Sequence, residues 1–170
     1  MQPSKRKEIG GISVDSSSTN IEMYYTACKF SDCAEFCMKA QQEKRNVPYL
    51  YTDPFIVNSA FSCEVFLKLL LRLEGIDYKK SHKLKDLFEK LPEEIQADIK
   101  SRTKEKCGYW LNVWGKEVLT QISNVFEKVR YIYENEWNKS SSIQIDMGYL
   151  GAFRESLKEE CEKRLAREKK

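Results

Sequence analysis

Hydrophobic residues recur every three to four positions along most of this 170-residue chain, a spacing that gathers them on one face of an α-helix. The pattern predicts helical stretches at about 20–44, 54–74 and 84–91, from Pro92, after Gly108 and after Asp146. No segment alternates between polar and apolar residues for long enough to predict a strand. We therefore expect an all-α protein.

Polar residues and glycine mark the expected helix ends. The side chain of Thr19 or Asn20 is placed to cap the first helix, that of Ser81 the third and that of Asp146 the last. Gly75 is expected to end the second helix, because glycine readily adopts the left-handed conformation found at helix ends.

The second helix is apolar on nearly all sides, which is typical of the central helix of a bundle. Glu64, Lys68 and Arg72 interrupt its apolar coat, and their spacing of four stacks them into one polar stripe. The residues that we expect to face inward along the chain are Met23, Ala27, Phe30, Ala34, Cys37, Ile56, Ala60, Cys63, Leu67, Leu70, Leu84, Leu87, Phe88, Leu91, Ile95, Ile99, Leu111, Trp114, Val118, Ile122, Val125, Val129, Ile132, Leu150, Phe153, Leu157, Cys161 and Leu165.

Positive and negative charges are nearly balanced, with 29 Lys and Arg against 26 Asp and Glu and a formal net charge of +3. The charges alternate in sign, as on solvated helix faces. Glu159 with Lys163 and Glu160 with Arg164 are spaced to pair on the outer face of the last helix. Such a balance permits nucleic acid binding without requiring it.

The chain is expected to divide into a flexible arm at residues 1–19 and a single helical domain at residues 20–170. The basic run Lys5–Lys7 is followed by glycine and serine, unlike the apolar core of a signal peptide. The longest apolar segment, at about 65–71, contains Lys68 and is too short to span a bilayer. We therefore expect a cytoplasmic protein with no membrane partner.

Six cysteines are present and are expected to be reduced thiols in the cytoplasm. Cys33 and Cys37 share one helix face, but a zinc site would need a fourth ligand and usually has closer cysteine pairs. Cys63 and Cys161 fall on apolar stripes and are expected to pack as small hydrophobic residues. The sequence predicts neither a metal nor a cofactor.

Three segments between about residues 55 and 135 resemble segments of one known family. Residues 58–71, NSAFSCEVFLKLLL, embed a Glu and a Lys among small and apolar residues. Residues 82–88, HKLKDLF, begin the next helix after a short loop, and residues 126–134, FEKVRYIYE, lie in the long helix that follows Gly108. In these segments the chain resembles the HEPN family of helical proteins.

This resemblance implies an up-and-down antiparallel bundle of four to five helices, often paired as a homodimer. It also implies a role around RNA, nucleotides or prokaryotic defence, toxin–antitoxin pairs included. Ribonucleases of the family carry an arginine and, four to six residues later, a histidine, which hold the scissile phosphate and move a proton. Here the one histidine is His82, far from Arg130, and Asn135 stands where that histidine would follow. Asparagine cannot accept a proton at neutral pH.

Glu64, Lys68, His82 and Arg130 form the candidate ligand-binding cluster. In one interpretation these side chains satisfy one another inside the bundle, and this is the one we favour, because a histidine beside a glutamate is weak evidence for a site. In the other, Lys68 and Arg130 hold a phosphate while Glu64 orients them. Arg130 with His82 or Glu134 is the weaker candidate for a catalytic centre.

From the sequence we therefore expect a non-catalytic HEPN-like module that binds a partner protein, a nucleotide or RNA. The absence of the general base at its expected position favours binding over catalysis. Two alternatives stay open: a metal-independent endoribonuclease with an atypical site, and a structural domain that forms a homodimer.

Overall fold

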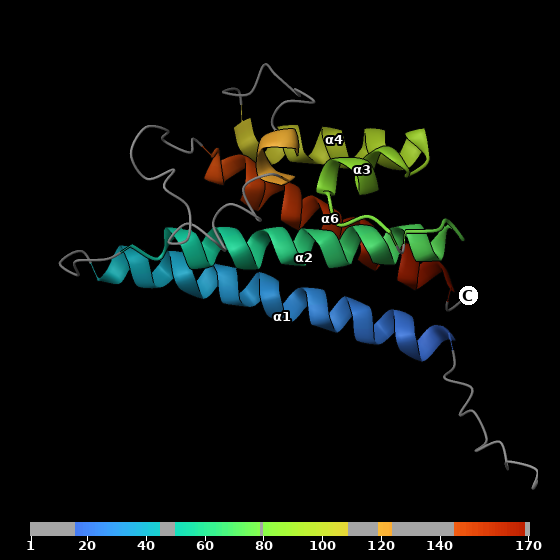
Figure 1. Ribbon diagram of the computed structural model, residues 1–170, viewed down its shortest axis with the longest axis horizontal. Coiled ribbons are helices and arrows are strands. Elements are labelled where there is room, and N and C mark those ends of the chain that lie inside the picture. The colour runs from blue at the N-terminus through green and yellow to red at the C-terminus, as the bar shows by residue number, and fades with distance from the viewer. Residues whose placement is uncertain (1–15, 45–49, 79, 109–118, 124–144, 169–170) are drawn as a thin grey trace, which may run out of the picture.

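Helix is the only secondary structure in the residues that the computed structural model describes, which are 16–44, 50–78, 80–108, 119–123 and 145–168. The elements are α1 (Ser16–Glu43), α2 (Thr52–Leu73), α3 (Leu84–Glu89), α4 (Glu93–Cys107) and α6 (Met147–Glu168), with a helical segment at 119–123 (Figure 1). The all-α prediction is confirmed. The helical segments of the described residues outnumber the four to five helices that the resemblance implies.

The four long helices among the described residues alternate in direction along the chain (Figure 1). α2 and α6 run the same way, because Arg154 of α6 contacts Ser59 of α2 while Arg164, farther along α6, contacts Glu74 just past α2. α1 and α4 run the opposite way. α2 and α6 lie in the middle, with α1 on one side and α3 and α4 on the other.

The core forms around α2, which α1, α3 and α6 cover on different sides. The predicted inner face of α2 is buried, and so are Phe66 and Leu69 on its other sides. In α1, Met23, Phe30 and Cys37 are only half-buried, because α1 lies at the edge of the bundle. The expected inward-facing residues that are buried in the other elements and in α1 are Ala27, Ala34, Leu84, Leu87, Phe88, Leu91, Ile95, Ile99, Ile122, Leu150, Phe153, Leu157, Cys161 and Leu165.

By length and composition alone, α2 is also apolar enough to cross a membrane. In this structure, 67% of that apolar window is buried against neighbouring parts of the protein. A helix that is hydrophobic all round is typical of a bundle core, so the central position of α2 accounts for its composition.

The predicted start of the first helix is wrong. α1 begins at Ser16, so Thr19 and Asn20 lie inside the helix and do not cap it. Asn20 is buried, and its Oδ1 accepts a hydrogen bond from Arg72 Nε at 2.8 Å. This partner lies on α2, so local sequence spacing could not reveal it. Residues 1–15 of the expected arm lie outside the described residues.

Of the other predicted helix ends, the cap at Ser81 is wrong, whereas those at Asp146 and Gly75 are confirmed. Ser81 does not cap α3: the capping position is Lys83, and the backbone N–H of Ser81 closes a turn onto the carbonyl of Tyr78. Asp146 does cap α6, because its Oδ1 accepts a hydrogen bond at 2.8 Å from the backbone N–H three residues later. Gly75 follows α2 with φ of +70°, as expected for a glycine that reverses the chain.

The stripe predicted for the long helix after Gly108 falls mostly outside the described residues. Ile122 of that stripe is buried, and so is its neighbour Leu119. The remaining members, from Leu111 to Val118 and from Val125 to Ile132, lie outside them.

Truncating a leucine in α2 should destabilise the protein far more than truncating an exposed one. Leu67 is fully buried, so Leu67→Ala should lower the free energy of unfolding by about 3 kcal/mol through lost burial and a cavity. Leu50 is 67% exposed, and Leu50→Ala should change it by less than about 0.5 kcal/mol. Urea denaturation followed by circular dichroism measures both. Equal effects would contradict the central position of α2.

Candidate functional site

Three of the four predicted ligand-binding residues meet beside α2. The carboxylate of buried Glu64 accepts on one oxygen, Oε1, from Lys68 Nζ at 2.7 Å and from His82 Nδ1 at 2.9 Å. We call Glu64, Lys68 and His82 the Glu64 cluster. Arg130 and Glu134, the other predicted site residues, lie outside the described residues.

Local sequence explains how this cluster assembles. Glu64 precedes Lys68 by one helical turn, the favourable order for an ion pair on a helix. After α2 the chain turns at Gly75, and the backbone N–H of Ile76 bonds back to the carbonyl of Leu71. The connector then returns alongside α2 and brings His82 to Glu64, eighteen positions away in the sequence.

The geometry assigns the hydrogens on the His82 ring. Nδ1 lies within hydrogen-bond distance of a carboxylate oxygen, which accepts only, so Nδ1 must carry a hydrogen. The 3.4 Å contact between Lys68 Nζ and His82 Nδ1 then joins two donors and is not a hydrogen bond. Nε2 is left on the far side of a side chain that is 71% exposed.

Lys80, Lys83 and Lys85 lie within three positions of His82 in the sequence. Lys80 and Lys83 are exposed and Lys85 is half-buried, and none of the three forms an ion pair within the part of the chain that the structure describes. Lys68, by contrast, is largely covered and is neutralised by Glu64. The excess positive charge therefore lies in the segment from 80 to 85, which also contains His82.

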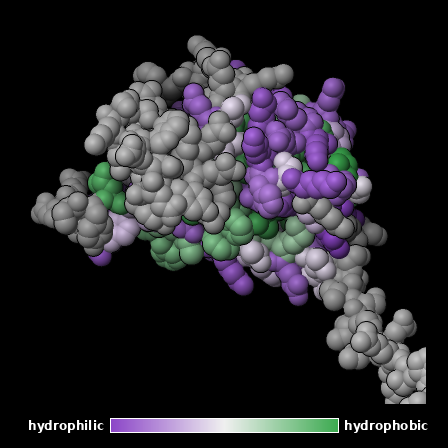
Figure 2. Space-filling model, in the orientation of Figure 1, coloured by the Kyte–Doolittle hydropathy of each residue, from purple (hydrophilic) through white to green (hydrophobic). Residues whose placement is uncertain are grey.

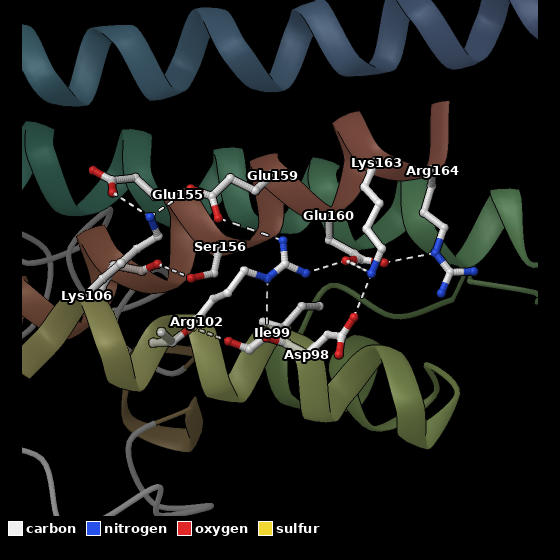
Figure 3. Close-up of polar contacts among 12 residues, drawn as sticks. Asp98, Ile99, Arg102, Lys106, Glu155, Ser156, Glu159, Glu160, Lys163 and Arg164 are labelled. Atoms are coloured by element: carbon white, nitrogen blue, oxygen red, sulfur yellow. Dashed lines mark hydrogen bonds and ion pairs between the residues drawn. The ribbon is translucent and has the colours of Figure 1, made fainter. Parts of the chain in front are cut away.

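A second polar network lies between α4 and α6, and the sequence did not predict that the two helices share it. Glu160 of α6 is fully buried and accepts hydrogen bonds from Arg102 of α4 and, at 2.9 Å, from Arg164 of its own helix. Figure 3 shows Arg102, Lys163 and Arg164 converging on Glu160. Burial by itself raises the pKa of Glu160, but the hydrogen bonds from Arg164 and Arg102 outweigh burial and hold this pKa below its ordinary value.

The outer-face ion pairs predicted for α6 need correction. Glu160 and Arg164 do pair, but inside the interface with α4 instead of on the outer face. Lys163 pairs with Asp98 of α4 at 2.6 Å instead of with Glu159. Spacing within one helix suggests which residues can reach each other, yet the packing of α4 against α6 supplies stronger partners.

Arg154 of α6 is a buried charge that sequence reasoning missed. Its guanidinium donates to Ser59 Oγ of α2 at 2.8 Å and pairs with Glu35 of α1. It also lies 5.8 Å from the centre of the Phe55 ring, so one side chain ties three helices together. An arginine among apolar residues in the predicted last helix was the available signal, but it could not show these partners.

The two cysteines expected in the core are buried. Burial raises the pKa of the Cys63 thiol to about 12, and burial likewise raises the pKa of Cys161. Both therefore stay protonated at neutral pH, and a protonated thiol is a poor nucleophile and a poor metal ligand. Among the described residues no three His, Cys, Asp or Glu side chains are grouped to hold a metal ion.

No protein-family model matches this chain, and no curated protein or solved structure is significantly similar to it. The likeness to the HEPN family therefore stays a prediction from the three sequence segments.

The buried carboxylate of Glu160 should make stability depend on pH. Glu160→Gln should lower the free energy of unfolding at pH 7 by about 3 kcal/mol, because Arg102 and Arg164 lose their charged partner. The folded pKa of Glu160 lies below the ordinary value. Its stabilisation is therefore complete above about pH 5 and is lost as the pH falls through the folded pKa.

Urea denaturation of wild type and Glu160→Gln at pH 7 and pH 3 tests this, with the difference between them expected to shrink at pH 3. Glu155→Gln is the control, since Glu155 is exposed on the same helix and should matter by less than about 0.5 kcal/mol. A difference that is the same at both pH values would contradict the role assigned to the Glu160 charge.

Proposed function

We propose that the chain is a non-catalytic, HEPN-like helical module that binds phosphate groups of RNA or of a nucleotide at the surface beside the Glu64 cluster. One observation carries this proposal: a single buried carboxylate oxygen holds the Lys68 ammonium and the His82 ring, and leaves the outer side of that ring exposed. We further propose that the protein works in the cytoplasm, where both ligands are abundant.

The charge around His82 supports phosphate as the ligand. Lys80 and Lys83 are exposed and carry no ion pair among the described residues, so their charge is not neutralised within that part of the protein. Exposed lysines suit a phosphate group, and they bind a nucleic acid backbone without reading its sequence.

The same geometry favours binding over catalysis. Cleavage of RNA without a metal needs a group that removes the 2′-hydroxyl proton and others that stabilise the phosphate or protonate the leaving group. Glu64 and Lys68 are engaged with each other and with Nδ1 of His82. In the described residues, that leaves Nε2 of His82 as the one group of this cluster that faces outward and can accept a proton.

The endoribonuclease alternative keeps one supporting observation. A carboxylate bound to Nδ1 fixes an imidazole in the tautomer whose Nε2 can accept a proton, and Glu64 does this for His82. If the protein cleaves RNA, His82→Ala should abolish cleavage in the presence of a metal chelator, and Glu64→Gln should reduce it strongly. On our proposal, the wild type, His82→Ala and Glu64→Gln all leave RNA intact at the same protein and RNA concentrations.

Reversing one lysine charge should weaken RNA binding. Lys80→Glu should raise the dissociation constant of a fluorescently labelled single-stranded RNA about tenfold, and the salt dependence of binding should become shallower by about one phosphate contact. Lys104→Glu is the matched control, because Lys104 is exposed on α4 and undergoes the same change in charge. Fluorescence anisotropy at several salt concentrations measures both effects.

Competition separates the two sources of phosphate. Displacement of the RNA by ATP at millimolar concentration would indicate a nucleotide site, whereas displacement only by unlabelled RNA would indicate an RNA surface. The proposal would be overturned if Lys80→Glu and Lys104→Glu weakened RNA binding equally. It would also be overturned if the wild-type protein bound neither RNA nor ATP, and attention would then turn to a protein partner.

A further inference from the structure

The outer face of α1 carries an exposed stripe with alternating steps of three and four residues. We call the α1 outer stripe the set Glu22, Tyr25, Lys29, Asp32, Phe36, Lys39 and Glu43, all of which are exposed. α1 forms one edge of the bundle, and Figure 1 shows no described element on its outer side. Figure 2 shows hydrophobic residues at the surface over α1 and α2, beside polar ones.

The stripe has the spacing of a helix–helix seam. Alternating steps of three and four residues average three and a half, which keeps a row of side chains facing a partner helix along the whole length. Tyr25 is 57% exposed and Phe36 is 67% exposed, and both count among the few large hydrophobic side chains exposed in the described residues. Among the large hydrophobic side chains of α1, these two aromatic rings are the ones that stay exposed, and the other residues of the stripe are charged.

The stripe is complementary to itself when reversed. If a second α1 lies antiparallel to the first and their midpoints meet between Phe30 and Ser31, positions whose numbers sum to 61 face each other. Tyr25 then faces Phe36 of the second copy. Glu22 faces Lys39 of the second copy, and Lys29 faces Asp32 of the second copy.

We propose that the α1 outer stripe is a homodimer interface, in which α1 of one copy packs antiparallel against α1 of a second copy. A two-fold interface needs one surface that matches itself, and each of the three facing combinations then occurs twice. The stripe meets this condition with opposite charges in two combinations and paired aromatic rings in the third.

The charges favour a second copy over other occupants. The stripe carries two basic residues and three acidic ones, and this mixed charge, with a net value of −1, gives no reason to attract RNA or a strongly charged peptide. Within the part of the chain that the structure describes, Glu22, Lys29, Asp32 and Lys39 form no ion pair of their own. This surface is separate from the Glu64 cluster, so the inference does not rest on the proposed function.

Charge exchange at the centre of the stripe tests the dimer. In the proposed dimer the contact between Lys29 and Asp32 of the second copy occurs twice. Lys29→Asp places two acidic residues opposite each other in both of these contacts, and Asp32→Lys places two basic residues opposite each other there. Each single change should raise the dimer dissociation constant at least about tenfold. The double variant Lys29→Asp/Asp32→Lys restores opposite charges and should restore the wild-type dissociation constant.

Sedimentation equilibrium of the full chain, from about 5 to 200 μM, measures this constant. A reducing agent is present throughout, because exposed Cys33 could otherwise link copies through disulfides. Thermal unfolding by circular dichroism at the lowest concentration checks that each variant folds. A monomer at every concentration would overturn the proposal. So would a dimer that both single variants leave intact, because it would form through another surface.

Discussion

The burial of α2 on nearly all of its sides is the constraint on which the rest of this structure depends. A helix that exposes so little polar surface is stable in water only when other elements cover it, and burial of apolar area is the main favourable contribution to folding. α1, α3 and α6 supply that cover. α4, in turn, packs against α6, so α6 lies between α4 and α2.

Covering α2 also fixes what must happen to the charges inside the bundle. A charge removed from water is costly unless a partner of opposite charge and further hydrogen bonds replace the solvent. Each of the buried charges Glu64, Arg154 and Glu160 is bound by at least two side chains. Both partners of Arg154 come from other helices, and Glu160 has one partner, Arg102, on another helix. Such contacts suit one alignment of the helices, because a slip of one turn would leave a buried charge without its partner. We expect these links to specify the packing more than they add to stability.

The surface chemistry reflects the same arrangement. The polar stripe of α2 reaches the surface where the connector before α3 passes over it, and there a buried carboxylate presents an exposed imidazole among lysines. On the opposite side of α2, α1 has only one face to pack and leaves the other in solvent. Two surfaces with different character result, one basic and one of mixed charge with exposed aromatic rings.

The sequence by itself determined the helical class, the positions of most described helices, the central place of α2 and most of the described core residues, because hydrophobic spacing along a helix is a local property. It also brought Glu64 and Lys68 together, one turn apart on α2. It did not determine the start of α1, the true partners of Glu160 and Lys163, or the position of Arg154 among three helices. Those depend on which helices meet, and spacing along one helix does not encode the contacts between helices. His82 stands between the two cases: its chemistry was evident from its side chain, but only the turn at Gly75 and the packing of the connector decided that its Nδ1 meets Glu64.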